Sequence, residues 1–245
     1  MDSGYYAAGT ALVTSTQQMD TIANNLANAS TVGYRAEKDI FSSVLADASN
    51  GGASSLDKAI NNYGILSGTI LDQSQGALQK TGNDLDVAIQ GPGYFVVQTA
   101  NGPMYTRNGG FQVSGKGQLV TATGDAVMGE SGTLTMLPGK VSISADGTIS
   151  VNGAVSGKLH IVGFPAGTKV ESAGNSYYTA PPDTAQTSTD SEVRQGFLES
   201  SNVNPILGLV DLITTQRSAE MMQRALSMFN SEIDKTATQD LPKVG

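Results

Sequence analysis

Few residues in this chain could perform chemistry. It has no Cys and a single His, His160. Thiol nucleophiles, disulfides, Cys zinc sites and paired His metal ligands are therefore excluded, and a Ser-His-Asp enzyme would depend on His160 alone. We expect His160 to be a surface or packing residue of a strand. No phosphate-binding glycine pattern surrounds Gly91-Pro92-Gly93, so this segment is expected to be a turn, and no cofactor is predicted.

Carboxylates are the remaining candidates for acid-base chemistry. Asp84 and Asp86 are two residues apart, so in a strand they would face the same way and could imitate the acid pair of a glycoside hydrolase. Solvated polar residues of a strand explain them more simply. A hydrolase that uses Asp84, Asp86 or Glu199 stays open as an alternative and requires a concave acidic cleft. We expect the chain not to be an enzyme.

The amino-acid composition excludes further classes of protein. Of 245 residues, 39% are hydrophobic, which is enough for a real core, and 15% are charged, against about 25% in a typical domain. The 29 glycines favour a turn-rich β body. A net charge of −8 without a basic cluster excludes nucleic acid as a partner. No apolar run approaches the roughly 20 residues of a membrane helix, so no membrane insertion is expected.

A heptad pattern predicts a helix over residues 3–29. Two sets of residues recur every seven positions, and half of the seam positions are small: Tyr5, Leu12, Met19 and Leu26 in one set, and Ala8, Ser15, Ile22 and Ala29 in the other. The pattern stops at Thr31-Val32-Gly33, where the glycine suits a turn.

A second heptad pattern predicts a long helix near the C-terminal end. Asn204 can cap its first amides and Pro205 suits its first position. The seam then comprises Leu212, Ala219, Leu226 and Ile233, interleaved with Thr215, Met222 and Phe229. A helix from Pro205 to about Ala237 would be roughly 50 Å long and needs a partner. The apolar Leu209, Val210 and Ile213 lie off this seam, so an intrachain helical hairpin and a polymer seam both stay possible.

Between the helices the hydrophobic period falls to two, which predicts β structure over residues 79–198. Leu85, Val87 and Ile89 alternate in one strand. Hairpin turns are expected at three pairs that tolerate positive φ: Asn101-Gly102, Asp146-Gly147 and Asn152-Gly153. The predicted fold class is α+β: long N- and C-terminal helices form a coiled-coil-like domain, and the central β domain is mainly antiparallel.

Three groups of residues resemble the bacterial flagellar rod and hook proteins. The first is Asn24-Asn25-Leu26-Ala27-Asn28 followed by Thr31-Val32-Gly33-Tyr34-Arg35. The second is Gly82-Asn83-Asp84-Leu85-Asp86-Val87-Ala88-Ile89, Gly91-Pro92-Gly93-Tyr94-Phe95, Tyr105-Thr106-Arg107-Asn108-Gly109 and Gly117-Gln118-Leu119-Val120-Thr121. The third is Leu198-Glu199-Ser200-Ser201-Asn202-Val203-Asn204 with the later Thr215-Gln216-Arg217. They cover both ends and the middle of the chain in the order found in that family.

This resemblance implies an axial protein with three regions: residues 1–35 and 200–245 as a helical core domain, residues 36–78 as an extended linker, and residues 79–199 as a β-rich outer domain. Amides of the first motif would bond between subunits without a net charge to desolvate, Gly33 would let the backbone leave the helix, and Arg217 could pair with a neighbour's carboxylate. With the heptad positions, the predicted subunit-packing residues are Leu12, Met19, Ile22, Asn24, Asn25, Leu26, Asn28, Gly33, Leu212, Arg217, Met222, Leu226, Phe229 and Ile233.

The resemblance further implies a structural subunit of the basal-body rod that polymerises through its terminal helices and transmits torque from motor to hook. The length and the plain Met1-Asp2-Ser3 start favour a proximal over a distal rod type. The implied partners are further copies of the chain, other rod and hook axial proteins, the flagellar export apparatus and the surrounding rings. Export without a cleaved signal peptide and a periplasmic location are implied as well. A secreted β-rich binding module with helical oligomerisation arms stays the alternative.

Overall fold

The computed structural model describes residues 2–42, 65–165, 167–182, 184–188 and 190–235. The chain forms two compact units. The first comprises Met1–Leu26, Lys38–Thr69 and Asn204–Gly245, and the second comprises Ala27–Glu37 and Ile70–Val203. The chain has a long helix near each end of its sequence and antiparallel sheets in the sequence between them, which confirms the predicted α+β class.

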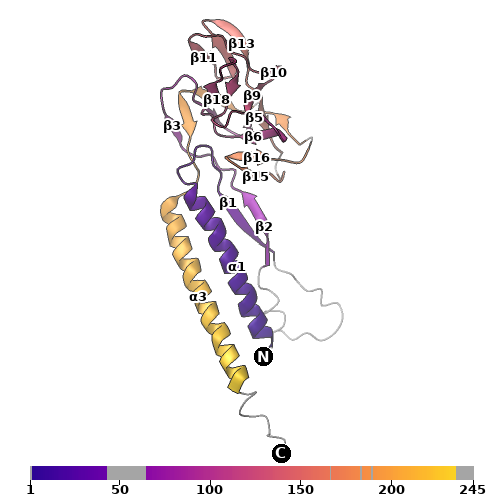
Figure 1. Cartoon of the computed structure of the whole chain (residues 1–245), viewed down its shortest axis with the longest axis vertical. Helices are drawn as coiled ribbons and strands as arrows, with labels where there is room; N and C mark the ends of the chain where they lie inside the picture. Colours follow the sequence, from indigo (N-terminus) through magenta and orange to yellow (C-terminus); the bar gives the residue numbers. More distant parts are fainter. Residues whose placement is uncertain (1, 43–64, 166, 183, 189, 236–245) are drawn as a thin grey trace, which may run out of the picture. The chain divides into compact units, whose positions relative to one another are not determined.

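The first unit contains two long helices that pack together: α1 (Asp2–Ala27) and α3 (Pro205–Lys235) (Figure 1). The predicted start of α3 is confirmed, because Oδ1 of Asn204 accepts hydrogen bonds from the amides of Ile206 at 3.1 Å and Leu207 at 3.3 Å. No helix within the described residues is both long and apolar enough to cross a membrane.

Two strands pair within the region predicted to be a linker. They are β1 (Glu37–Ser42) and β2 (Ile65–Leu71). On α1, the Thr21 hydroxyl donates a hydrogen bond of 2.9 Å to a carboxylate oxygen of Asp39 in β1. Residues 43–64 lie outside the described part of the chain, so the linker stays a prediction.

The second unit is built from short strands, all paired antiparallel. They are β3 (Leu78–Lys80), β4 (Val87–Gln90), β5 (Tyr94–Thr99), β6 (Gly102–Thr106), β7 (Gln112–Val113), β8 (Leu119–Val120), β9 (Ala126–Gly129), β10 (Gly132–Thr133), β11 (Val141–Ile143), β12 (Thr148–Val151), β13 (Ala154–Lys158), β14 (Ile161–Gly163), β15 (Glu171–Gly174), β16 (Tyr177–Thr179), β17 (Gln186–Thr187), β18 (Glu192–Gln195) and β19 (Phe197–Glu199).

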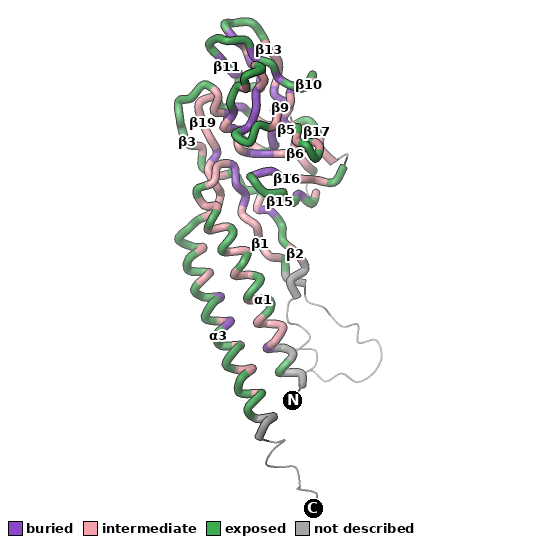
Figure 2. The backbone as a smooth tube through the Cα atoms, in the orientation of Figure 1, coloured by how far each residue is buried: buried purple, intermediate pink, exposed green. Residues whose placement is uncertain are grey.

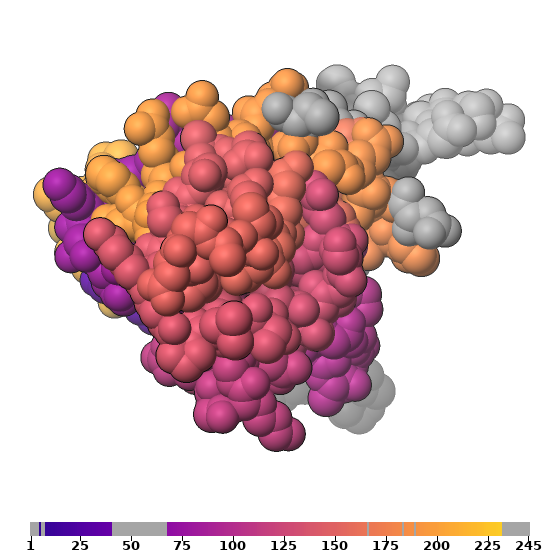
Figure 3. All heavy atoms as spheres, turned by 90° about the horizontal axis from the view of Figure 1, so that it is seen from above, coloured from indigo at the N-terminus to yellow at the C-terminus, as the bar shows by residue number. Residues whose placement is uncertain are grey.

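The largest sheet has ten strands in the order β15-β16-β6-β5-β9-β8-β7, with β10 on β9 and β14 between β5 and β17. Smaller sheets pair β11-β12-β13, β18-β4 and β19-β3. In Figure 3, the middle of the sequence, coloured magenta to orange, forms most of the face that is seen.

Hairpins form near all three predicted pairs. Ala100-Asn101 joins β5 to β6, one residue before the expected pair, because Gly102 is already the first residue of β6 and lies opposite Thr99. Asp146-Gly147 lies in the connection from β11 to β12, and Asn152-Gly153 joins β12 to β13. In the last pair both residues have positive φ, 50° for Asn152 and 85° for Gly153, as a type I′ turn requires. Local turn chemistry therefore sets the register of these hairpins.

Two apolar clusters hold the second unit together, and Figure 2 shows the buried backbone concentrated among its strands. The smaller cluster comprises Leu71, Tyr94, Val170 and Tyr178, and the larger one is the main core. Phe95 and Phe111 meet edge to face, with ring centroids 5.1 Å apart. The expected apolar positions are found in this core, because Val87 and Ile89 are buried in it and Leu85 packs against it. Ala88, between Val87 and Ile89, is buried as well.

Candidate assembly surface and buried junction

Helix α3 has an inner face, which carries the predicted heptad seam. Thr215 and Ala219 are buried on it, and Leu212, Met222, Leu226 and Phe229 are half-buried. Since α1 packs on α3, this is the side that faces α1. The backbone of Ile233 is helical, but its side chain lies outside the described part of the structure.

The opposite side of α3 is a second apolar stripe, here called the outer face. At about 100° per residue, five large apolar residues fall on one side of the helix. Their exposures are high: Ile206 73%, Val210 55%, Ile213 52%, Met221 59% and Met228 66%. The predicted site residue Arg217 lies on the same side and is exposed, as is Arg224. These side chains are therefore available to a partner.

On α1 the predicted packing residues divide by exposure. Leu12, Met19, Ile22, Asn25, Leu26 and Asn28 are half-buried, whereas Asn24 is exposed. Asn28 lies just beyond the helix, where its side-chain oxygen accepts a hydrogen bond of 3.2 Å from the Thr31 hydroxyl. Whether these residues pack between subunits stays a prediction.

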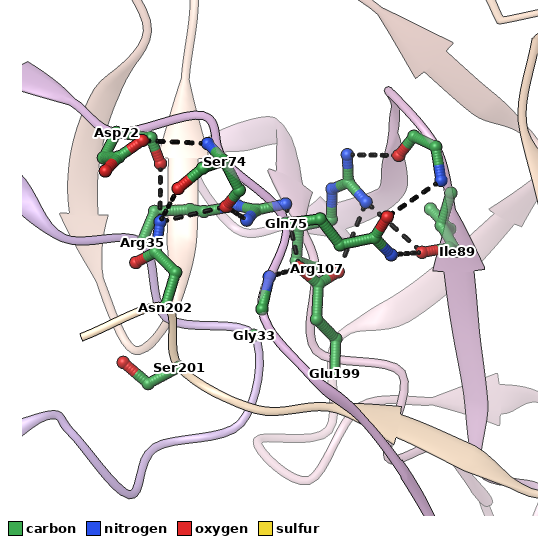
Figure 4. Close-up of polar contacts among 12 residues, drawn as sticks. Gly33, Arg35, Asp72, Ser74, Gln75, Ile89, Arg107, Glu199, Ser201 and Asn202 are labelled. Atoms are coloured by element: carbon green, nitrogen blue, oxygen red, sulfur yellow. Dashed lines mark hydrogen bonds and ion pairs between the residues drawn. The ribbon is translucent and has the colours of Figure 1, made fainter. Parts of the chain in front are cut away.

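Downstream of α1, the second unit contains a buried charge cluster, here called the junction cluster: Arg35, Arg107 and Glu199 (Figure 4). Nη2 of Arg35 lies 2.9 Å from one Glu199 oxygen, and Nη1 of Arg107 lies 3.2 Å from the other. The side chains are only 1%, 3% and 1% exposed, respectively. One carboxylate thus compensates two guanidinium groups that have no access to water.

Further contacts complete this environment. Arg107 also donates to the carbonyl oxygen of Gly91 at 2.9 Å and lies 5.0 Å from the centroid of the Tyr94 ring, a cation–π distance. Burial lowers the pKa of Arg107, and the adjacent Glu199 carboxylate opposes that shift. Burial likewise raises the pKa of the Tyr94 and Tyr178 hydroxyls.

Backbone contacts connect the cluster to the chain that leaves α1. The Gly33 amide donates to the Glu199 carbonyl oxygen at 2.7 Å. The Tyr178 hydroxyl donates to the Gly33 carbonyl oxygen at 3.0 Å and accepts from the Arg35 amide at 2.8 Å. Gly33 itself is buried with φ +69°, so the predicted need for glycine at this turn is confirmed.

Asn202 makes a parallel set of contacts beside the cluster (Figure 4). Its Oδ1 accepts from the Ala36 amide at 2.7 Å, and its Nδ2 donates to the carbonyl oxygens of Asp72 at 2.9 Å and Ser74 at 3.0 Å. A single amide therefore joins three segments that are far apart in the sequence.

The acidic residues of the hydrolase alternative do not form an acid pair. The Glu199 carboxylate forms ion pairs with Arg35 and Arg107 and accepts a hydrogen bond of 2.9 Å from the Gly76 amide. Asp84 and Asp86 precede β4 rather than lie in it, and Oδ1 of Asp86 accepts from Asn83 at 3.0 Å. Asp84 lines a groove of about 710 Å³, but Asp86 and Glu199 do not. An acidic cleft built from these three residues is absent.

The other residues singled out for chemistry have structural roles. His160 is half-buried beside β14, and its backbone amide donates to the Met128 carbonyl oxygen at 3.1 Å. Within the described residues, no three His, Cys, Asp or Glu side chains gather as a metal site.

The junction cluster was not among the predicted sites, although the sequence carries a signal for it. Arg35, Arg107 and Glu199 come from the first, second and third of the flagellar motifs, respectively. In a chain with so few charges, complementary charges in three separate motifs suggest a shared ion pair.

Comparisons with known proteins agree with these motifs. Residues 6–35 match the family described as flagella basal body rod protein, residues 88–151 the flagellar hook protein FlgE/F/G D1 domain, and residues 194–239 the flagellar basal body rod FlgEFG protein C-terminal region. The flagellar basal-body rod protein FlgF of Caulobacter vibrioides is 32% identical over 100% of both chains.

Two further relatives support the same assignment. The FlgF protein of Mesorhizobium japonicum is 34% identical over 96% of each chain. The FlgG protein of Buchnera aphidicola subsp. Schizaphis graminum is 33% identical over 89% of this chain and 92% of its own. The chain therefore belongs to the flagellar basal-body rod protein family, whose members are structural and not enzymes, and it is a subunit of that rod.

Proposed function

We propose that this rod subunit polymerises through its terminal helices into the shaft that transmits torque from motor to hook. The outer face of α3 carries the proposal. A helix needs one apolar face to pack within its own chain, and α3 has two. Burying five large side chains at about 1.5–3 kcal/mol each would contribute roughly 8–15 kcal/mol, enough to hold a neighbouring subunit.

Charge on the outer face supports the same role. Arg217 and Arg224 are exposed among the apolar side chains, whereas the whole chain has a net charge of −8. Neighbouring copies or other axial proteins with surplus carboxylates would complement these two cations. Arg217 in particular can pair with a carboxylate of the next subunit.

We further propose the proximal rod type. The FlgF relatives above cover 96–100% of this chain, whereas the FlgG relative covers 89%. On this proposal residues 1–35 and 200–245 form the axial core and residues 79–199 form the outer domain. Half-buried residues of α1, such as Asn25 and Leu26, would then contribute to the contacts between subunits in addition to the outer face of α3.

Location and partners follow from the same proposal. The subunit would leave the cytoplasm through the flagellar export apparatus and assemble in the periplasm. It would then contact other rod and hook proteins and the surrounding rings. The absence of Cys suits this route, because a thiol could form unwanted cross-links in an oxidising compartment.

A pair of charge substitutions on α3 tests the polymer contact. Ile213→Asp places a carboxylate on the outer face, and Gln223→Asp places the same charge at an exposed position away from the outer face. We expect Ile213→Asp to abolish rod assembly and motility and Gln223→Asp to preserve both. The measurements are swimming in soft agar and recovery of hook-basal bodies by electron microscopy.

The purified variants provide the control for folding. Both should keep the helical signal of the unsubstituted chain in circular dichroism, because Ile213 lies away from the inner face. Leu226→Asp, on the inner face, should abolish assembly while the β unit stays folded. Motile cells with normal rods that contain Ile213→Asp would contradict the proposal.

A further inference from the structure

The chain passes between its two units at four points: after Leu26, Glu37, Thr69 and Val203. On the side of the second unit, these passages lie at the ends of the segments 27–37 and 70–203. Three stretches of these segments carry the contacts described below: 33–36 in the segment 27–37, and 72–76 and 199–202 near the two ends of the segment 70–203. Here they are called the connecting stretches.

Ion pairs hold the connecting stretches together (Figure 4). Arg35 from the first stretch pairs with Glu199 from the third at 2.9 Å, and it also donates to the Ser74 carbonyl oxygen in the second. The Glu199 carboxylate in turn accepts from the Gly76 amide at 2.9 Å. Arg107, from the strand layer of the same unit, fixes the other carboxylate oxygen.

Main-chain bonds reinforce these ion pairs. The Asp72 amide donates to the Ala36 carbonyl oxygen at 2.7 Å, and the Ser200 amide donates to the Ala77 carbonyl oxygen at 2.9 Å. Asn202 bridges the same stretches through its side-chain amide. The first stretch therefore cannot separate from the third without exposing buried ions and breaking several hydrogen bonds together.

Burial makes this connection all-or-none. Removing the carboxylate would leave Arg35 and Arg107, 1% and 3% exposed, as two buried cations that have lost the counterion they share. Partial opening of the cluster breaks ion pairs without the compensating hydration free energy, which is gained only when water reaches both guanidinium groups. The connecting stretches should consequently stay closed under a moderate force and open in one step under a large one.

We propose that Glu199 is a positioning residue that keeps the connecting stretches together under mechanical load, so that the four chain passages move together. The ion pairs of Glu199 with Arg35 and Arg107, together with the bonds of Asn202, are here called the clamp. Twisting force on the helical unit then reaches the β unit through all four passages together rather than through one of them. This inference rests on the proposed function, because only a subunit of a rotating shaft has to carry such a load.

Trypsin reports the state of the clamp directly, because it cleaves after Arg35, which is buried in the closed cluster. In the purified full chain, cleavage after Arg35 is measured by mass spectrometry relative to cleavage after the exposed Lys116. We expect Glu199→Gln to raise this ratio at least about tenfold, because the closed population falls. The matched control is Glu192→Gln, an exposed carboxylate 3.7 Å from Arg194.

Asn202→Ala serves as a second variant that removes no charge. Asn202 is half-buried, so its loss should preserve the fold and raise cleavage after Arg35 by a smaller factor. If Glu199→Gln fails to accumulate, Asn202→Ala decides the test. Cleavage after Arg35 at the rate of the Glu192→Gln control in both clamp variants would overturn the proposal.

Motor rotation separates a load-bearing role from simple stability. Cells with Glu199→Gln or Asn202→Ala subunits are tethered to beads of increasing drag. We expect rotation to match the unsubstituted strain at low drag and to fail at high drag. Equal performance at every drag, or an equal loss at every drag, contradicts the clamp. Absence of the unsubstituted chain from purified rods would instead defeat the proposed function itself.

Discussion

Replacing Gly33 with alanine should destabilise the junction far more than an ordinary loss of a turn glycine. Gly33 has φ +69° in a buried position. A Cβ there would lie 2.8 Å from Cα of Asn108 and closer still to the Asn108 nitrogen and the Arg107 carbonyl carbon. All three are backbone atoms, so no side-chain rotation can relieve the contact.

The size of the effect follows from two terms. The left-handed conformation costs alanine about 1–2 kcal/mol, partly offset by about 0.4–1 kcal/mol from the stiffer unfolded chain. Substitution of Gly82 measures this conformational cost alone, because Gly82 has φ +77° and an added Cβ would meet no atom within 4 Å. Gly82→Ala should therefore cost about 1 kcal/mol or less. For Gly33→Ala, displacement of the Asn108 backbone brings the total to at least about 3 kcal/mol.

Urea unfolding of the purified chain measures both variants. The near-ultraviolet circular dichroism comes mainly from the tyrosines, since the chain has no tryptophan. Five of the eight tyrosines lie in the second unit, namely Tyr34, Tyr94, Tyr105, Tyr177 and Tyr178, so this signal reports largely on the β unit. The Gly33→Ala midpoint should fall well below that of Gly82→Ala at an unchanged slope. Equal losses in the two variants would refute the reasoning that a backbone collision makes glycine necessary at position 33.

Three further predictions concern other parts of the chain. Asn204→Ala removes the cap of α3 and should lower helix stability by about 1 kcal/mol, seen as faster hydrogen exchange in the first turn; unchanged exchange would contradict the cap. Ile149→Ala, at a fully buried position, should cost about 2–5 kcal/mol in urea unfolding, whereas Val155→Ala, at a side chain 72% exposed, should cost less than about 0.5 kcal/mol. Burial, and to a lesser degree Glu37, raises the pKa of Tyr34 from 10.0 to about 12. Its stabilising contribution is therefore full below pH 10 and is lost as the pH rises to about 12; the fall of the unfolding free energy over this range should be shallower in Tyr34→Phe, and an identical fall would refute the shift.

The helices and hairpins could be predicted because their signals are local. Asn204-Pro205 places a cap and a suitable first residue side by side, and Asn152-Gly153 supplies the two positive φ angles that its turn needs. Heptad spacing likewise indicates which side of α3 is least exposed. In each case the determining residues lie within a few positions of one another.

The junction cluster could not be predicted in this way because its contacts are long-range. Arg107 and Glu199 are separated by 92 positions, and only the folded chain brings them within 3.2 Å. No spacing rule connects them with Arg35.

The most direct test of the central claim is cross-linking from the outer face of α3 in assembled rods. Because the chain has no Cys, Ile213→Cys introduces a unique thiol that can carry a photoreactive benzophenone maleimide. Illumination of purified hook-basal bodies should join position 213 to another axial subunit, identified by mass spectrometry, whereas Gln223→Cys should give little product. Equal yields from the two positions, or no adduct from position 213 in intact rods, would contradict the account.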